Sequence, residues 1–224
     1  MSPSCLRFYG RHHGKKISPS RQALMTTLLP QIQFKDMDSI PSGVPVYLEI
    51  GFGGGEHLFA VAQAHPEAFF VGAEPFVNGV ASLLDLLHQN PEVRNICIYP
   101  DDVRKLFEVF PDRLFDGIFL LYPDPWPKVR HEKRRFLVPD QQRSLARLLK
   151  PDGWLQVATD VEAYALWAQE VMDQTGLWRQ TLEDIHCPPQ GWVTTRYEQK
   201  GLKAGRVPTY LLYKLAVQAL PQGQ

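Results

Sequence analysis

The stretch that decides the fold is FDGIFLLYPDPWPKVRHEKRR, residues 115–135. Its apolar run, residues 118–122, is too short for a helix core and has the length of a buried strand. Prolines on both sides of Asp124 end that strand, because proline donates no ladder hydrogen bond and restricts the residue before it. Asp124 therefore follows the carboxyl end of a buried strand, where open α/β sheets bind their ligands.

Basic residues follow this turn at once. Residues 126–150 carry eight Lys/Arg and two Asp/Glu, and residues 1–35 carry six Lys/Arg and no acid, although the formal net charge of the chain is zero. A uniformly solvated surface does not have this distribution, so we interpret both clusters as phosphate-binding surfaces on a protein that acts on a polyanion. Their members are Arg7, Arg11, Lys15, Lys16, Arg130, Lys133, Arg134 and Arg135.

Strands and helices alternate in both directions from this stretch. We expect strands at residues 46–50, 68–73, 95–99, 115–122, 154–158, 178–182 and 207–215. We expect helices at 20–29, 56–64, 75–88, 103–110, 139–149 and 162–174, and a turn at 150–153. This spacing predicts an α/β fold with a doubly wound, mostly parallel, seven-stranded Rossmann-like sheet and helices on both faces. No helical pattern separates the last two strands, so the final one is expected to run antiparallel.

The bulk composition sets limits on domain number and compartment. With 224 residues, 44% of them hydrophobic, we predict a basic flexible arm at 1–17 and a single domain at 18–224. The three cysteines are far apart and form no CxxC pair, which argues against zinc and disulfides and indicates a reducing cytoplasm. No run of about 18 apolar residues predicts a membrane span. Monomer and homodimer are both left open.

A glycine loop, LEIGFGGG at residues 48–55, follows the first strand. Gly51 and Gly53 let the backbone approach a ligand closely. Glu56 stands where a dinucleotide fingerprint has its third glycine, and its negative charge would repel a pyrophosphate. Glu49, two residues before the loop, would instead face a cation such as the amino-acid end of S-adenosylmethionine (SAM).

Acids also follow the other strands of the predicted sheet. Glu74 follows the second strand, Asp101 and Asp102 the third, and Asp160 the fifth. Each alone is typical of a turn, but the carboxyl ends of parallel strands share one edge, so together with Asp124 they predict a site for a cation. Glu74 is expected to accept hydrogen bonds from ribose hydroxyls, and either Asp101 or Asp102 from an adenine amino group.

At this point the sequence resembles the bacterial tRNA (guanine-N7)-methyltransferases, from about residue 6 to residue 215. The PDPW turn with KRR behind it and T-x-Y-E downstream are the most specific pieces. One departure is Val129, where the family often has a second lysine. The resemblance is carried by LEIGFGGGEH (48–57), GAEP (72–75), DDV (101–103), YPDPWPKVRHEKRR (122–135), KPDGW (150–154), ATD (158–160) and TRYEQKG (195–201).

The resemblance implies a cytoplasmic enzyme that transfers the methyl group of SAM to N7 of the variable-loop guanine, position 46, in tRNA. It implies Asp124 as the catalytic acid and no metal. It implies a cofactor site made of Glu49, Gly51, Gly53, Glu74, Asp102 and Asp124. It implies substrate contacts from Lys128, Asp160, Thr195, Arg196, Tyr197 and Glu198.

The chemistry of guanine suggests roles for these residues. N7 already carries an in-plane lone pair, so alignment is the main requirement and no proton has to leave first. The carboxylate of Asp124 would stabilise the purine as it becomes cationic. Asp124 or Asp160 would accept from guanine N1–H and its exocyclic amine, and Trp126 or Tyr197 would stack on the displaced base.

Three other functions are weighed against this one. A SAM-dependent methyltransferase for another nucleophile, such as a protein amine or an mRNA cap, fits the glycine loop but not the basic clusters. A non-enzymatic RNA-binding protein on a methyltransferase fold would have a degenerate loop, whereas the expected acids are intact. An NAD-dependent oxidoreductase is disfavoured by Glu56.

Overall fold

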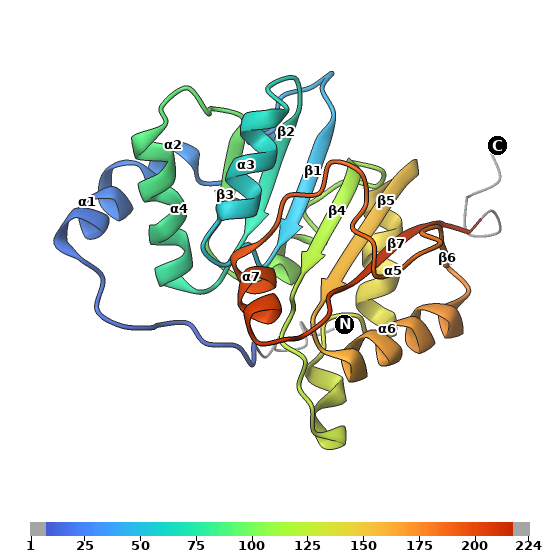
Figure 1. Ribbon diagram of the computed structural model, residues 1–224. Helices are drawn as coiled ribbons and strands as arrows, with labels where there is room; N and C mark the ends of the chain where they lie inside the picture. The colour runs from blue at the N-terminus through green and yellow to red at the C-terminus, as the bar shows by residue number, and fades with distance from the viewer. Residues whose placement is uncertain (1–7, 217–224) are drawn as a thin grey trace. The chain divides into compact units, whose positions relative to one another are not determined.

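The computed structural model describes residues 8–216, and the chain forms two compact units, Met1–Phe110 and Pro111–Gln224 (Figure 1). Backbone hydrogen bonds order the seven strands as β3-β2-β1-β4-β5-β7-β6. This confirms the predicted seven-stranded, mostly parallel α/β sheet. The single domain at 18–224 and the flexibility of the arm stay predictions, and residues 1–7 of the arm lie outside the described part.

The first unit contributes three parallel strands. Leu48 of β1 lies opposite Val71 of β2, which lies opposite Cys97 of β3. All three side chains are buried, as expected for parallel strands that are covered on both faces. The elements of this unit are α1 (Pro19–Thr27), α2 (Leu29–Ile32), η1 (Met37–Ser39), β1 (Val46–Ile50), α3 (Glu56–Ala64), β2 (Phe69–Ala73), α4 (Val77–Gln89), β3 (Ile96–Tyr99) and η2 (Val103–Leu106).

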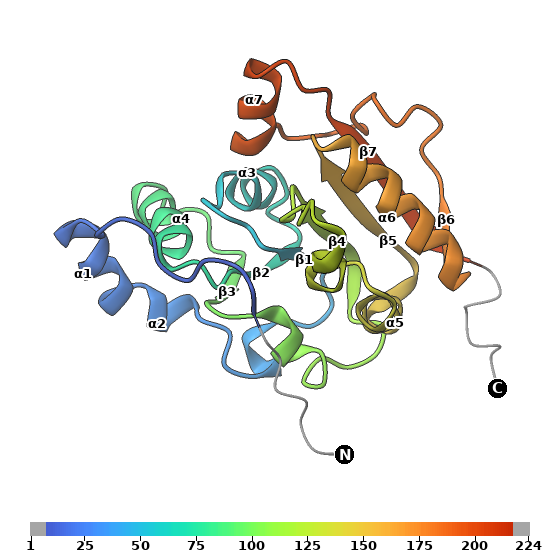
Figure 2. The same ribbon diagram turned by 90° about the horizontal axis from the view of Figure 1, so that it is seen from below.

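The second unit contributes four strands and ends antiparallel. Strand β7 runs antiparallel to both β5 and β6, which confirms the predicted direction of the final strand. Helices α5 and α6 pack beside each other against β5 (Figure 2). Its elements are β4 (Phe115–Leu121), η3 (Val129–Arg134), α5 (Pro139–Leu148), β5 (Leu149–Thr159), α6 (Glu162–Thr175), β6 (Trp178–Gln180), α7 (Arg196–Lys203) and β7 (Thr209–Leu215).

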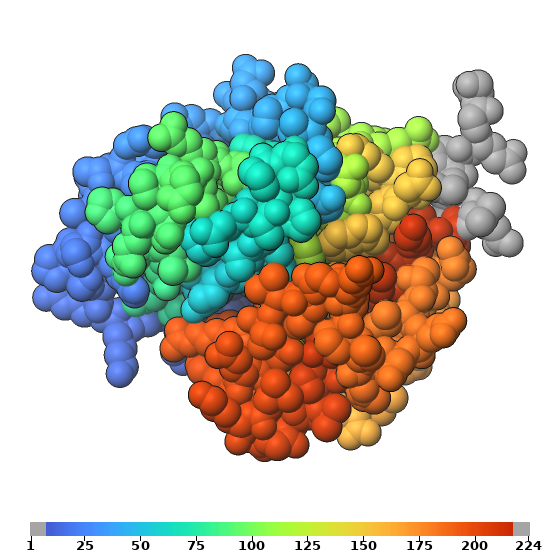
Figure 3. Space-filling model, turned by 45° about the horizontal axis from the view of Figure 1, so that its top comes forward, coloured from blue at the N-terminus to red at the C-terminus, as the bar shows by residue number. Residues whose placement is uncertain are grey.

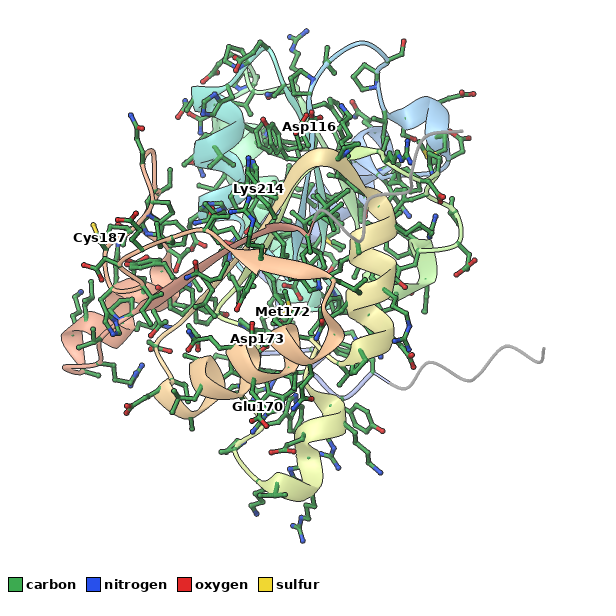
Figure 4. The ribbon with its side chains drawn as sticks, turned by 90° about the vertical axis from the view of Figure 1, so that its right-hand side faces the viewer. Asp116, Glu170, Met172, Asp173, Cys187 and Lys214 are labelled. Carbon is green, nitrogen blue, oxygen red and sulfur yellow. The ribbon has the colours of Figure 1, made fainter. Side chains whose placement is uncertain are left out.

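Helix α6 shows how the second unit covers its sheet. Its residue Met172 is fully buried, whereas Glu170 and Asp173 on the same helix are exposed (Figure 4). The helix ends at Gly176, whose φ of 63° is the left-handed conformation that glycine adopts without strain. None of the helices described between residues 8 and 216 has the length and apolar character needed to cross a bilayer.

Two predicted boundaries are corrected at their prolines and turns. The helix expected at 20–29 ends at Thr27, and Pro30 lies in the first turn of α2, where its missing N–H costs nothing. The turn expected at 150–153 lies within β5, whose register with β4 shifts between Phe115 and Gly117. Between the paired positions β4 has one residue, Asp116, and β5 has four, so residues 150–153 form a bulge within the strand instead of a separate turn.

Two helix predictions are also corrected. The helix expected at 103–110 is one 3-10 segment, η2, followed by a turn. We expected no helix between the last two strands, but α7 lies there. Its large apolar residues, Tyr197 and Leu202, are both exposed, so no buried apolar stripe marks this helix in the sequence.

Candidate active site

The glycine loop in the first unit takes the conformation that its residues allow. Gly51 and Gly53 have φ values of 73° and 56°, in the left-handed region. Helix α4 packs directly on this loop, since a Cβ added at Gly79 would lie 2.1 Å from the carbonyl oxygen of Gly53. The loop and the start of α4 are therefore in backbone contact.

Glu74 ties the same two segments together. One carboxylate oxygen accepts a 2.7 Å hydrogen bond from the Gly53 N–H, and the other accepts a 2.8 Å bond from the Phe76 N–H. Only 7% of the residue is exposed. The buried Glu74 carboxylate therefore holds the glycine loop to the start of α4.

Glu49 is buried at the end of β1 and has a partner that sequence reasoning missed. His57 of α3 is hydrogen-bonded through Nδ1 to Glu49 Oε2 at 2.7 Å, and both side chains are buried. Within residues 8–216, Glu49 Oε1 has no hydrogen-bond partner. The sequence did contain a clue to this contact, because His57 lies in the first turn of the helix that directly follows the glycine loop.

The acids after β3 are held by neighbouring bases. Asp102 is buried and accepts from the backbone N–H and the guanidinium of Arg104, with the shortest contact at 2.5 Å. Asp101 is paired with Lys105 at 2.6 Å. Desolvation acts to raise the pKa of Asp101. The hydrogen bonds from Lys105 and the Asp102 N–H, together with the positive charges of Lys105 and His12, outweigh it, so the pKa lies below its usual value. The choice between Asp101 and Asp102 at an adenine stays a prediction.

The described part of the arm is attached to the start of α4. The Asn78 side chain accepts from the Gly14 N–H and donates to the Lys15 carbonyl oxygen, both at 2.7 Å. The Val77 N–H donates to the carbonyl oxygen of His12 at 2.9 Å. Here the arm borders a hollow of about 460 Å³ whose lining includes Lys15 and Lys16.

In the second unit, Asp124 lies in a strained turn. Tyr122 and Trp126, on either side of Pro123–Pro125, have φ values of 51° and 41°. Such conformations cost roughly 1–3 kcal/mol each for residues other than glycine and are concentrated at functional sites. Asp124 accepts no hydrogen bond from any residue between 8 and 216. Its side chain is exposed, yet the surrounding protein desolvates the carboxyl enough to raise its pKa.

Arg135 is the second functional residue that sequence reasoning misjudged. We predicted that it binds phosphate with the other bases of its run, but only 6% of the residue is exposed. Its guanidinium donates to the carbonyl oxygens of Pro125 and Trp126, at 3.0 and 3.2 Å. The prediction is wrong for Arg135 because these carbonyls, and not solvent, surround its charge.

The other residues of this segment remain accessible. Lys128, Arg130 and Lys133 are exposed. The guanidinium of Arg134 lies 5.0 Å from the centre of the Trp126 ring, close enough for a cation–π contact. Trp126 is half-buried, whereas 49% of Tyr197 is exposed, which favours Tyr197 as the aromatic residue that stacks on a base.

The stretch 195–198 forms the start of α7. The Thr195 hydroxyl accepts from the Glu198 N–H at 3.0 Å and caps the helix, and both residues are buried. Arg196 and Tyr197 are exposed, and Lys200 lies 5.6 Å from the Tyr197 ring. In Figure 3 the start of α7 lies within the larger orange-to-red surface formed by the C-terminal part of the described chain.

Glu198 and Asp160 anchor α7 to the rest of the unit. Glu198 accepts from Trp192 Nε1 and from the Tyr210 hydroxyl, both at 2.7 Å. Asp160 accepts from Arg206 Nε at 2.7 Å. A Cβ added at Gly201 of α7 would lie 2.5 Å from Asp160, so this glycine lets the helix approach closely. Of the predicted substrate residues, the exposed ones are Lys128, Arg196 and Tyr197.

No group of three or more His, Cys, Asp or Glu side chains among residues 8–216 is arranged to hold a metal ion. Cys97 and Cys187 are free thiols, and Cys187 lies in the exposed loop that precedes α7 (Figure 4). Burial raises the pKa of the Cys97 thiol to about 12, so this thiol stays protonated.

Comparisons with known proteins agree with this geometry. Residues 44–211 match a family model described as "Putative methyltransferase". A tRNA (guanine-N(7)-)-methyltransferase of Granulibacter bethesdensis is 40% identical over 218 residues, covering 92% of this chain and 94% of that protein.

Two solved structures share the fold. The 16S rRNA methyltransferase KamB has a TM-score of 0.56 at 15% identity, with 90% of this chain and 95% of that one covered. A mutant 16S rRNA (adenine(1408)-N(1))-methyltransferase from Catenulisporales acidiphilia, solved with cosubstrate SAM, has a TM-score of 0.53 at 14% identity. It covers 77% of this chain and 85% of its own. These likenesses confirm the Rossmann-like methyltransferase fold.

Proposed function

The chain belongs to the tRNA (guanine-N(7)-)-methyltransferase family, and we propose that it transfers a methyl group from SAM to N7 of the variable-loop guanine, position 46, of tRNA. The observation that carries this proposal is the 40% identity over nearly the whole length of a curated tRNA (guanine-N(7)-)-methyltransferase. The Asp124 carboxylate, which accepts no hydrogen bond from the described residues and lies in a strained turn, supports it. The reaction takes place in the cytoplasm.

The residues of the first unit fit SAM as the methyl donor, which supplies an electrophilic methyl group on a sulfonium. Among residues 8–216, Oε1 of Glu49 has no hydrogen-bond partner, and a carboxylate suits the ammonium of the amino-acid end. The buried carboxylate of Glu74, just after β2, accepts from the ribose hydroxyls. Asp102 accepts from the adenine amino group, and Gly51 and Gly53 let the backbone come close to the ligand.

Asp124 of the second unit acts on the guanine. Its carboxylate accepts from guanine N1–H and the exocyclic amine, which selects guanine and aligns N7. As positive charge develops on the purine, an ionised Asp124 becomes more favourable in the transition state than in the ground state. Because N7 needs no deprotonation, Asp124 orients the base and stabilises charge.

The exposed residues Lys128, Arg196 and Tyr197 make the direct contacts with RNA in this proposal. Tyr197 stacks on the displaced base, and the two cations bind phosphate. Thr195 and Glu198 act by holding the first turn of α7, on which Arg196 and Tyr197 are carried. Asp160 holds the other side of that helix through Gly201 and Arg206.

Incubation with SAM labelled in its methyl group and unmodified tRNA, followed by digestion to nucleosides, tests the function. We expect the label in 7-methylguanosine. Label in another nucleoside, or in protein, would show a methyltransferase for a different nucleophile. Tight tRNA binding with no label anywhere would show a non-enzymatic binding protein.

Replacing Glu74 with glutamine tests the cofactor site. The change keeps the size of the side chain but removes its charge and one of its two acceptors. Since hydrogen bonds to charged groups contribute roughly 1.5–3 kcal/mol, we expect SAM affinity to fall at least about tenfold by calorimetry. Glu67→Gln, at an exposed acid of the same unit, is the control. Equal affinities for the wild type and Glu74→Gln would remove Glu74 from the site.

Replacing Lys15 and Lys16 together with alanine tests the arm. We expect weaker tRNA binding and a plot of log affinity against log salt that is flatter by up to about one unit for each lost phosphate contact. Lys214→Ala, at an exposed lysine of β7, controls for the loss of positive charge (Figure 4). A salt slope that the double variant leaves unchanged would mean that the arm contacts no phosphate.

A further inference from the structure

The turn that carries Asp124 is fixed at both of its ends by different means. At the first end, the Tyr122 N–H donates to the Ala158 carbonyl oxygen of β5 at 2.7 Å, which extends the strand pairing one residue beyond β4. At the second end no strand is available, and the chain leaves the turn with Trp126 at positive φ. Something else must hold that end of the turn.

Arg135 is the group that does so. Its Nε donates to the Pro125 carbonyl oxygen and its Nη2 to the Trp126 carbonyl oxygen, so one rigid guanidinium spans two successive peptide groups. Its Nη1 donates to Glu132 at 3.4 Å. All three nitrogens of the guanidinium are thus engaged within the protein.

Helix α6 fixes the guanidinium itself. The guanidinium carbon lies 4.6 Å from the centre of the Trp167 ring and 6.0 Å from that of Tyr164, and Tyr164 is fully buried. A buried charge is costly unless it is paired and hydrogen-bonded. The partners of Arg135 are chiefly the backbone carbonyls of the turn. Its charged hydrogen bonds therefore fix the backbone at Pro125 and Trp126.

We propose that Arg135 is a positioning residue: it holds the Pro125–Trp126 end of the turn and thereby aims the Asp124 carboxylate at the guanine. This inference rests on the proposed function. This role distinguishes the buried Arg135 from Arg130 and Lys133 of the same basic segment, which are exposed to solvent. Its effect should therefore appear in the chemical step and not in the binding of phosphates.

A double-mutant cycle with Asp124 tests this role. Arg135→Lys keeps the charge, but an ammonium cannot reproduce the fork that spans two carbonyls. A misplacement of the order of 1 Å can cost about a hundredfold in rate, so we expect the single-turnover rate to fall about tenfold or more. The salt dependence of tRNA binding should not change. Combined with Asp124→Asn, Arg135→Lys should lower the rate by less than about twofold.

Arg147→Lys is the matched control, because Arg147 lies in the same unit and pairs with Asp112 instead of the turn. If Arg135→Lys lowers the rate equally with and without Asp124, its effect is a general loss of structure and the proposal is overturned. A normal rate in Arg135→Lys overturns it as well, and so does a reduced salt slope. A wild-type protein that methylates no guanine would instead refute the proposed function.

Discussion

Replacing Asp124 with asparagine is expected to lower the rate of methyl transfer by roughly two or more orders of magnitude, as for the loss of one preorganised electrostatic group. The change keeps the shape of the side chain and removes the charge that the cationic purine requires. Single-turnover kinetics at saturating SAM and tRNA isolate this step. A near-normal rate there would mean that Asp124 is structural and that alignment alone carries the reaction.

Folding provides the control for this variant. Desolvation raises the pKa of the Asp124 carboxyl, which means that the folded protein favours the neutral form. Removing the charge at pH 7 should therefore not lower the melting temperature. Asp116→Asn, on the strand β4 that precedes the turn and paired with Lys150, should leave the transfer rate unchanged (Figure 4).

The pH profile of the rate gives a second readout for Asp124. In the proposed mechanism the active form of Asp124 is the ionised carboxylate, and the raised pKa means that this form is lost at a higher pH than for an ordinary aspartate. We expect the wild-type rate to fall as the pH is lowered through the pKa of Asp124, which gives the pH profile an acid limb. In Asp124→Asn the limb should disappear, because the group that titrates is gone.

Replacing Gly79 with alanine is expected to lower SAM affinity by roughly a hundredfold. In a helix the change would ordinarily be favourable by about 1 kcal/mol. Here the new Cβ would lie 2.1 Å from the Gly53 carbonyl oxygen, so either the glycine loop or α4 must move. Overpacking costs typically 1–3 kcal/mol, and a backbone atom cannot yield as a side-chain tip can.

Calorimetric titration with SAM measures this effect, and thermal unfolding shows whether the variant is folded. Ser82→Ala, also on α4, is the control for a small substitution in the same helix. An affinity in Gly79→Ala equal to that of the control would show that the loop tolerates displacement. The loop would then not be part of the cofactor site.

Local chemistry explains which parts of the fold the sequence predicts. Strand β1 and helix α3 have the predicted bounds because a short apolar run, a glycine loop and a periodic run follow one another there. The turn at Asp124 was predicted because two prolines mark it, and β4 does end before it. Helix α7 was missed although Thr195 and Glu198 have the spacing of a capping box, which was interpreted only as part of a substrate motif.

Arg135 shows what sequence reasoning lacks. In the run Lys133-Arg134-Arg135 the three bases are chemically alike, and nothing local distinguishes one from another. The difference arises from packing, since only Arg135 reaches the carbonyls of the turn and the aromatic rings of α6. The same holds for His57, whose partner Glu49 precedes it by eight residues on another element.

The most direct test of the central claim uses a tRNA transcript that carries 7-deazaguanine at position 46. This base lacks N7 and keeps the N1–H and the exocyclic amine, so the transcript should bind like the unmodified one. We predict that labelled SAM transfers its methyl group to the transcript with guanine at position 46 and not to the transcript with 7-deazaguanine. Equal labelling of the two transcripts would contradict the assignment of guanine N7 as the nucleophile.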